Sequence, residues 1–351
     1  MNCLYLTGAE IGLETGDGVV TKHECKALSE LGETTILEKK DIHPNVYRQS
    51  YSPFLFDYFA DVHIDRKYDL CHIYGGPYPA TVEKLKREGC TVSITIPAHD
   101  RKLSIEEHER WFGEYPFHHV RDPYLWSLHV RYMNLADSIV CPSTRSKRIL
   151  EEEGVETPIT VIPHGTEIPD TVAPLPDDFT VAYLGVVGPD KGLIYLLQAW
   201  SQLNYDDAEL ILAGPGTEHL APTIQQITMH GKFRLLGRVA NIRDVFDQCS
   251  VYVQPSTNEG FGITALEAMA HGRPVIVSDG AGSSDCVSGG DDGFTVPARD
   301  PGSIAGSIDV FKKYPEHIQK MGNAARETAK EYSWDKIRRR YTGHFRRLVL
   351  E

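Results

Sequence analysis

Two glutamates, Glu259 and Glu267, stand eight positions apart around a turn formed by Gly260, Phe261 and Gly262. An apolar strand-like run precedes them and a helical run follows from residue 264, which predicts a strand, a glycine-rich loop and a helix. The N-terminus of such a helix offers free N–H groups and a positive dipole end to a phosphate. Carboxylates repel phosphate, so we expect both glutamates to accept hydrogen bonds from hydroxyl groups. A ligand with hydroxyls on both sides of a diphosphate is a nucleotide sugar.

Lys191 is a candidate cation for the same site. It follows another strand-like run and stands among Gly185, Gly188 and Gly192. In a glycine-bearing loop an ammonium group can meet a diphosphate as a point charge. The ordinary alternative is a solvated surface lysine, but the surrounding glycines favour phosphate contact.

The size and composition of the chain indicate a two-domain globular protein. Its 351 residues exceed the size at which single cores usually stop growing, and 41% apolar with 24% charged residues is ordinary for a soluble protein. A net charge of −13 argues against general nucleic-acid binding through a basic surface. Seven dispersed cysteines favour a reducing compartment, and the sequence shows neither a signal peptide nor a long apolar run. We therefore expect a cytoplasmic protein.

Short apolar runs alternate with helical patterns along the chain. The expected strands are 3–7, 34–37, 70–74, 91–96, 138–141, 159–162, 180–184, 209–213, 234–236, 251–254, 275–278 and 294–296. The expected helices of the first half are 19–31, 79–88, 123–135 and 144–153. This alternation predicts an α/β protein with two Rossmann-like, doubly wound domains that face a cleft at the carboxyl ends of their strands. We place an N-terminal domain at 1–165, a proline-bearing linker at 166–178 and a C-terminal domain at 179–330.

The C-terminal stretch 316–351 departs from the alternation and is expected to be helical. Trp334, Ile337, Tyr341 and Leu348 lie roughly on one face of a helix over 331–351, which also carries six Lys/Arg against three Asp/Glu. One interpretation is a helix that packs on the protein and exposes a basic face. The other is weak attachment to anionic lipid at the inner face of a membrane.

The residues from Glu259 to Glu267 resemble the signature of retaining GT-B glycosyltransferases of the large family 4 type. Further motifs that resemble this family in order and spacing lie at 161–165, 184–192, 212–216, 236–239, 278–282, 292–294 and 332–334. The resemblance covers essentially all of 159–351 and is weaker over 1–158. It implies a GT-B fold whose last helix, 331–351, crosses back to the N-terminal domain.

The resemblance also implies a reaction, the transfer of a hexose from a UDP- or GDP-sugar to an acceptor hydroxyl with retention at the anomeric carbon. Glu259 would then bond hydroxyls of the transferred sugar rather than act as a nucleophile, and Glu267 would accept the ribose hydroxyls. Backbone groups of Gly260, Phe261, Gly262 and Ile263 would hold the sugar and the diphosphate. The acceptor, whether glycan, lipid or small molecule, is not indicated, and neither is the oligomeric state.

Further donor-binding candidates lie at other loops that resemble the family. Gly185 precedes Lys191, and Arg238 and Val239 stand where the family places the base. The turn ending in Gly16 and Gly18 comes before a predicted helix, so its backbone could face the donor phosphates. A plain tight turn is the alternative for these two glycines.

His99 ends a strand-like run in a way that resembles the family's His-bearing strand end. We expect it to bond the donor sugar or a developing charge, and a merely structural histidine is the alternative. The segment 101–126 is rich in aromatic residues and histidine, which fits either an acceptor-binding region or core packing. Taken together, the expected catalytic residues are His99, Lys191 and Glu259.

One position departs from the family. Relatives often carry arginine directly after the glycine at Gly185, where this chain has Val186, so a two-cation clamp on the diphosphate is in doubt. Backbone amides and a helix dipole can still stabilise the leaving phosphate. No Asp-x-Asp motif stands at a convincing strand end, so we expect no essential metal and no cofactor.

Three rival functions remain at the level of sequence. A GT-B sugar phosphorylase or disaccharide synthase can share the glutamate pair. A catalytically silent sugar-nucleotide-binding subunit belongs to a different class, and the retained Lys191, Glu259 and Glu267 argue against it. A Rossmann-type dehydrogenase is disfavoured, because the glycines at 8, 12 and 16 do not match G-x-G-x-x-G.

Overall fold

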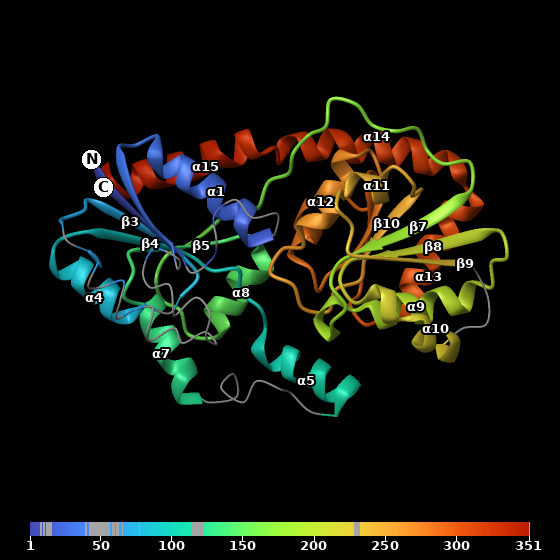
Figure 1. Ribbon diagram of the computed structural model, residues 1–351, viewed down its shortest axis with the longest axis horizontal. Coiled ribbons are helices and arrows are strands. Elements are labelled where there is room, and N and C mark those ends of the chain that lie inside the picture. The colour runs from blue at the N-terminus through green and yellow to red at the C-terminus, as the bar shows by residue number, and fades with distance from the viewer. Residues whose placement is uncertain are drawn as a thin grey trace. The chain divides into compact units, whose positions relative to one another are not determined.

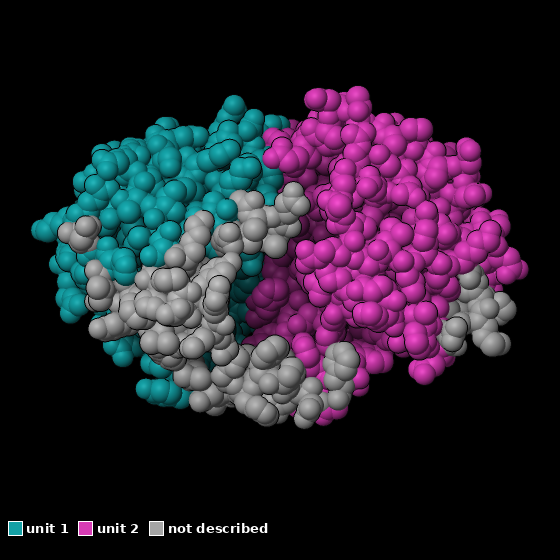
Figure 2. Space-filling view, viewed as in Figure 1, with its two compact units in different colours: residues 1–98, 116–164, 334–351 teal, residues 99–115, 165–333 magenta. Residues whose placement is uncertain are grey.

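The computed structural model describes residues 1–7, 9, 11, 16–38, 41, 57, 60, 63–64, 66–76, 78–113, 123–227 and 232–350. The chain divides into two compact units, coloured separately in Figure 2. Unit 1 comprises Met1–Ala98, Pro116–His164 and Trp334–Glu351, and unit 2 comprises His99–Tyr115 and Gly165–Ser333. The described residues 99–113, which fall in the first half of the sequence, thus belong to unit 2 with the second half of the chain.

Unit 1 is built on a six-stranded parallel sheet with the order β2-β1-β3-β4-β5-β6. Its strands are β1 (Asn2–Thr7), β2 (Glu33–Glu38), β3 (Leu70–Tyr74), β4 (Thr91–Thr95), β5 (Ser138–Cys141) and β6 (Ile159–Val161). Its helices are α1 (Gly16–Ser29), α4 (Pro79–Arg87), α7 (Pro123–Met133), α8 (Thr144–Glu152) and α15 (Trp334–Leu350). Every residue of β3 and β5 is buried, as expected for parallel strands covered on both faces.

The helix α15 packs beside α1 although the two lie at opposite ends of the sequence (Figure 1). The Trp334 ring stacks on His23 with a centroid separation of 4.2 Å. Further along, Thr342 donates a hydrogen bond to Glu30 (3.0 Å), and buried His344 bonds Ser138 (3.2 Å). The expected return of the C-terminal helix to the N-terminal domain is therefore confirmed.

Unit 2 is built on a second six-stranded parallel sheet, with the order β12-β11-β10-β7-β8-β9. Its strands are β7 (Phe179–Leu184), β8 (Ala208–Ala213), β9 (Lys232–Gly237), β10 (Val251–Gln254), β11 (Val275–Ser278) and β12 (Gly293–Val296). Its α-helices are α5 (Arg101–Phe112), α9 (Leu193–Leu203), α10 (Ala221–Ile227), α11 (Arg243–Phe246), α12 (Ile263–Ala270), α13 (Pro301–Lys313) and α14 (Pro315–Glu331). Short 3-10 turns, η1 (Pro189–Lys191), η2 (Thr217–His219) and η3 (Gly282–Cys286), complete it.

Alternate residues along the strands of unit 2 enter two hydrophobic clusters on opposite faces of the sheet. Val181 and Tyr183 pack with α9 and α13, whereas Ala182 and Leu184 pack with α11, α12 and α14. Figure 1 shows these two helical layers on either side of the sheet. The two-domain α/β fold expected from the alternating pattern is confirmed.

The observed strands coincide with the predicted ones to within two residues at each end. The expected helical stretch 316–351 comprises α14 and α15, and α15 matches the expected last helix at 331–351 to within three residues. One feature differs from the sequence analysis. The helix α5 was not predicted, because 101–126 was interpreted only by its aromatic content.

Candidate functional site

The loops after β7 and β10 belong to neighbouring strands of unit 2. These strands pair with each other, while β7 also pairs with β8 and β10 with β11, so the strand order reverses between β7 and β10. Ligands bind at such a reversal in open α/β sheets, outside the carboxyl ends of the strands. The two loops approach closely at Gly192, where φ is 63° and a Cβ would overlap the carbonyl oxygen of Pro255. The reversal thus brings together Lys191 from the first loop and Glu259 from the second.

The Lys191 ammonium and the Glu259 carboxylate form an ion pair across these loops. Only 28% of the Lys191 side chain and 12% of the Glu259 side chain are exposed. Glu259 Oε2 accepts hydrogen bonds from Ser256 Oγ at 2.8 Å and from Gln254 Nε2 at 3.1 Å. Burial by itself would raise the pKa of the Glu259 carboxyl, but Lys191, Ser256 and His99 lower it below its usual value. Glu259 is therefore ionised at neutral pH, and Lys191 offsets its repulsion of a phosphate.

Buried polar side chains behind Glu259 fix the orientation of its carboxylate. The Tyr252 hydroxyl donates to Gln254 Oε1 at 2.8 Å, and Gln254 Nε2 approaches Ser256 Oγ at 2.8 Å. All three side chains are buried. In a medium of low dielectric such a connected network holds its members in one arrangement. The network thus holds the Glu259 carboxylate in one orientation.

The turn at 260–262 leads directly into α12. Gly262 precedes the helix with a φ of 87°, a left-handed conformation that favours glycine. Phe261 is only 3% exposed and packs in the core, so its side chain anchors the turn. Ile263 opens the helix. The Ala265 N–H already donates to the Gly262 carbonyl oxygen at 3.3 Å, so the N–H groups of Ile263 and Thr264 are the candidates for contact with an anion.

Glu267 lies in the second turn of α12 and is half-buried. Burial raises the pKa of its carboxyl to about 7. Within the part of the chain that the structure describes, the carboxylate makes no hydrogen bond or ion pair, in contrast to Glu259. The two glutamates therefore differ electrostatically, since one is paired and ionised and the other titrates near neutrality.

His99 lies in unit 2, beside the Glu259 loop. Its Nδ1 is 3.4 Å from the carbonyl oxygen of Asn258, and the ring is exposed. The neighbouring Asp100 caps α5 by accepting a hydrogen bond from the Leu103 N–H at 3.0 Å. The three expected catalytic residues, His99, Lys191 and Glu259, thus belong to one compact body.

The other predicted residues of unit 2 lie on neighbouring strand ends. Gly185 follows β7, and a Cβ at Gly214 would overlap its carbonyl oxygen, so the loops after β7 and β8 touch there. Arg238 follows β9 and is exposed, whereas Val239 is half-buried. Val186 is 49% exposed, and this position carries no cation.

Gly16 and Gly18 lie in unit 1, in the first turn of α1. The helix thus begins three residues earlier than predicted and includes both glycines, which were expected in a turn before it. Of the aromatic segment 101–126, residues 114–122 lie outside the described residues.

Sequence reasoning missed the polar residues that support the site, among them Gln254, Ser256, Asn258 and Asp190. A signal for the first three was present, because Gln254 ends the otherwise apolar strand β10 and the polar Ser256 and Asn258 follow it. Asp190 could not be recognised, because its partners lie far away in the sequence.

Family models match most of the chain. The model of glycosyl transferases group 1 matches residues 166–328, and that of glycosyltransferase family 4 matches residues 19–168. The chain belongs to the family 4-like glycosyltransferases. The resemblance stated from the motifs is confirmed at this level.

Similar proteins agree with this assignment. An uncharacterised glycosyltransferase of Methanocaldococcus jannaschii is 32% identical over 167 residues, which are 46% of this chain and 43% of that protein. The chain spans less than half the length of the first curated relatives it matches.

Solved structures of other proteins share the whole fold. Sucrose-phosphate synthase from Thermosynechococcus elongatus superposes with a TM-score of 0.81 at 18% identity and covers 100% of both chains. Anabaena HepE in complex with UDP superposes with a TM-score of 0.71 at 16% identity and covers 99% of this chain and 100% of its own. The two Rossmann-like sheets of this family 4-like glycosyltransferase therefore form a GT-B fold.

The described residues contain no group of three His, Cys, Asp or Glu side chains that could hold a metal ion. No described helix is long and apolar enough to cross a membrane.

Proposed function

We propose that this family 4-like glycosyltransferase moves a hexose from a nucleotide diphosphate sugar to an acceptor hydroxyl, with retention at the anomeric carbon. The observation that carries the proposal is the Lys191–Glu259 ion pair beside the N-terminus of α12. It combines a cation for the diphosphate, an ionised acceptor for sugar hydroxyls and N–H groups for a developing negative charge. Anabaena HepE, which shares the fold, was solved with UDP and with UDP-glucose, so UDP-sugars are the first donors to test.

Each residue has a proposed role in this reaction. Lys191 and the first N–H groups of α12 stabilise the leaving diphosphate. Glu259 accepts hydrogen bonds from the transferred sugar, and Glu267 accepts them from the ribose. Arg238 and Val239 lie beside the base, and Gly185, Gly16 and Gly18 contribute backbone near the phosphates. His99 bonds the donor sugar or the charge that develops on it.

Retention is proposed without a protein nucleophile. Glu259 is held by Lys191, Ser256 and Gln254, which suits a fixed hydrogen-bond acceptor better than a group that attacks carbon. Attack from the same face, with a donor phosphate oxygen taking the acceptor proton, requires no further base. Proton NMR of the fresh product distinguishes retention from inversion by the anomeric coupling.

Metal independence is a separate proposal. Lys191 supplies positive charge where other phosphate sites employ a divalent ion. Activity should persist in excess EDTA, and restoration by added Mg²⁺ or Mn²⁺ after its loss would show that a metal is required.

The decisive experiment is a screen for nucleotide release. UDP- and GDP-sugars are incubated with and without candidate glycan, lipid and small-molecule acceptors, and the released UDP or GDP is measured. Phosphate with a disaccharide is tested in parallel, since turnover there alone would favour a phosphorylase. A silent binding subunit would bind UDP in calorimetry without turnover, and binding of neither UDP nor GDP would remove the donor site itself.

Two variants test the glutamates separately. Glu267→Ala should raise the dissociation constant for the donor, because the ribose loses its acceptor. Glu259→Ala should mainly lower kcat, because it contacts the transferred sugar. Unchanged kinetics in both variants would refute the site.

A further inference from the structure

Asn258 joins the start of α5 to the loop that carries Glu259. Its side-chain amide donates to the Asp100 carbonyl oxygen at 2.7 Å, and its side-chain oxygen accepts from the Asp100 N–H at 3.0 Å. One carboxamide thus satisfies both backbone groups of a single residue, in the way that a neighbouring strand would. Asn258 is 1% exposed, so water competes little for these bonds.

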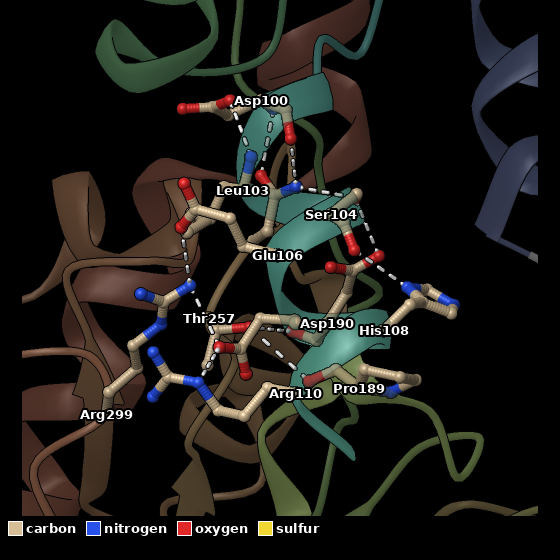
Figure 3. Close-up of polar contacts among 12 residues, drawn as sticks. Asp100, Leu103, Ser104, Glu106, His108, Arg110, Pro189, Asp190, Thr257 and Arg299 are labelled. Carbon is tan, nitrogen blue, oxygen red and sulfur yellow. Dashed lines mark hydrogen bonds and ion pairs between the residues drawn. The ribbon is translucent and has the colours of Figure 1, made fainter. Parts of the chain in front are cut away.

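The two Asn258–Asp100 hydrogen bonds form a clamp, and a second set of contacts links this clamp to the turn that carries Lys191. The Ser104 hydroxyl lies 2.9 Å from the Asn258 amide and donates to the Asp190 carboxylate at 2.9 Å. The Asp190 carbonyl oxygen in turn accepts the Thr257 N–H at 2.8 Å. Figure 3 shows Ser104 and Asp190 facing one another, with Thr257 beyond. The first turn of α5 is therefore tied to both loops that carry the Lys191–Glu259 pair.

The middle of α5 is anchored independently. Glu107 is fully buried, accepts a hydrogen bond from the Tyr195 hydroxyl at 3.1 Å and pairs with Arg299 at 2.8 Å. Arg299 also approaches Glu106, as Figure 3 shows. Because all these contacts lie within unit 2, the place of residues 99–112 beside the donor-site candidates does not depend on unit 1.

This clamp fixes the residue directly before Asp100, which is His99. A carbonyl oxygen can only accept, so the contact of His99 Nδ1 with the Asn258 carbonyl oxygen requires a proton on Nδ1. In the neutral ring Nε2 then keeps its lone pair and can accept a hydrogen bond from a sugar hydroxyl. The backbone and the side chain of Asn258 thus set both the position and the tautomer of His99.

We propose that Asn258 is a positioning residue that holds His99 against the Glu259 loop. The proposal rests on the proposed function for its kinetic consequence, but the geometry can be tested without turnover. Residues 99–112 then act as part of the donor-binding body, and His99 serves the donor rather than the acceptor.

The first test measures the tautomer of His99. Protein labelled with ¹⁵N-histidine is titrated in an NMR tube, and the His99 ring signals are assigned with a His99→Gln variant. We expect the neutral ring to carry its proton on Nδ1, and Asn258→Ala to reduce that population. A proton on Nε2 in the unchanged protein, or identical ring shifts in Asn258→Ala, would overturn the proposal.

The second test is kinetic and uses UDP release from UDP-glucose as the probe reaction. Asn258→Ala should lower kcat about 10- to 100-fold, since a small misplacement of a group near the reacting atoms can have this effect, and it should change KM little. In a double-mutant cycle with His99→Ala, the double variant should be no slower than His99→Ala alone. Fully additive losses would mean that Asn258 does not act through His99.

Two further variants complete the design. Asn258→Leu keeps the side-chain volume and replaces Asn258→Ala if that variant fails to fold, as judged by circular dichroism. Lys102→Ala removes an exposed charged side chain from the first turn of α5 and should leave the His99 shifts and kcat unchanged. If the unchanged protein releases no UDP from UDP-glucose, the donor assignment fails, while the tautomer measurement still decides the role of Asn258.

Discussion

The Lys191–Glu259 ion pair places opposite charges in direct contact, in the loops that follow the paired strands β7 and β10. The ammonium group has three donors, and one is taken by Glu259, which leaves others for a diphosphate. The same pairing lowers the pKa of the Glu259 carboxyl and so favours its ionised form. Loss of Lys191 would remove the phosphate contact and leave a buried carboxylate without its cation.

We therefore predict that Lys191→Met weakens UDP binding by about tenfold or more, because a hydrogen bond to a charged group contributes roughly 1.5–3 kcal/mol. Isothermal titration calorimetry at constant ionic strength measures the change. Lys320→Met, at an exposed position on α14, removes the same charge elsewhere and should leave the affinity unchanged. Equal affinities in all three proteins would exclude Lys191 from the phosphate site.

Glu267 makes the stability of the protein depend on pH. Burial raises the pKa of its carboxyl from an ordinary 4.5 to about 7, so between these values the folded state holds a proton that the unfolded state has lost. The free energy of unfolding then falls as pH rises through this window, and the full loss is present above about pH 7.

Glu267→Gln should consequently be more stable than the unchanged protein at pH 8, by on the order of 1–3 kcal/mol given about 1.4 kcal/mol per pKa unit and partial solvent exposure. The two proteins should unfold alike near pH 4.5. Urea denaturation at both pH values provides the comparison. A stability gain of equal size at both would assign the effect to packing instead of titration.

At the scale of elements, α15 is held to unit 1 by a buried aromatic contact. Trp334 is 3% exposed and stacks on His23, whose pKa burial lowers to about 4, so the partner ring is neutral at physiological pH. Large buried aromatic residues dominate the energetics of such contacts.

We predict that Trp334→Ala lowers the free energy of unfolding by about 3–5 kcal/mol, as truncation of a buried aromatic side chain typically does. Arg339→Ala changes an exposed residue of the same helix and should alter stability by less than about 0.5 kcal/mol. Urea denaturation monitored by circular dichroism distinguishes them. Similar small losses in both variants would mean that α15 contributes little to unit 1.

The outer side of α15 carries the basic residues that suggested lipid attachment. Arg339, Arg340, Arg346 and Arg347 are exposed, and each arginine near an anionic surface can contribute about 1 kcal/mol. If the face binds lipid, the protein should sediment with phosphatidylglycerol vesicles at low salt and less so with phosphatidylcholine. Arg346→Glu with Arg347→Glu should weaken this binding. Equal sedimentation with both lipids would leave packing and solvation as the role of this helix.

At the scale of the whole molecule, hydrogen exchange can show whether the donor contacts one unit or both. We predict that UDP-glucose slows hydrogen exchange at 184–192, at 255–267 and at 99–104, all in unit 2. If Gly16 and Gly18 contact the donor phosphates, the first turn of α1 in unit 1 gains protection as well. Mass spectrometry with UDP alone, without the sugar, is the control for the contribution of the hexose. Protection confined to unit 2 would remove the two glycines from the site.

The strands were predictable because parallel strands covered on both faces must be short and apolar throughout. β10, β11 and β5 were located to the residue. Lys191, Glu259 and Glu267 could be selected as candidate site residues from the sequence, because each lies within one strand–loop–helix unit. The helix α5 could have been predicted from Asp100 as its N-cap and Gly113 as its C-terminal stop. The segment was instead interpreted from its aromatic composition, which does not indicate where a helix begins or ends.

The sequence alone determined the two doubly wound domains, the family-like motifs and the glutamate pair, because these are local patterns of periodicity and spacing. Only the tertiary structure showed that Lys191 pairs with Glu259 and that residues 99–112 belong to unit 2. These facts depend on contacts between residues far apart in the sequence, such as Asn258 with Asp100 and Arg299 with Glu107. The Lys191–Glu259 pair depends on the pairing of β7 with β10, and the other contacts depend on the packing of α5 on unit 2. No local spacing in the sequence encodes either arrangement.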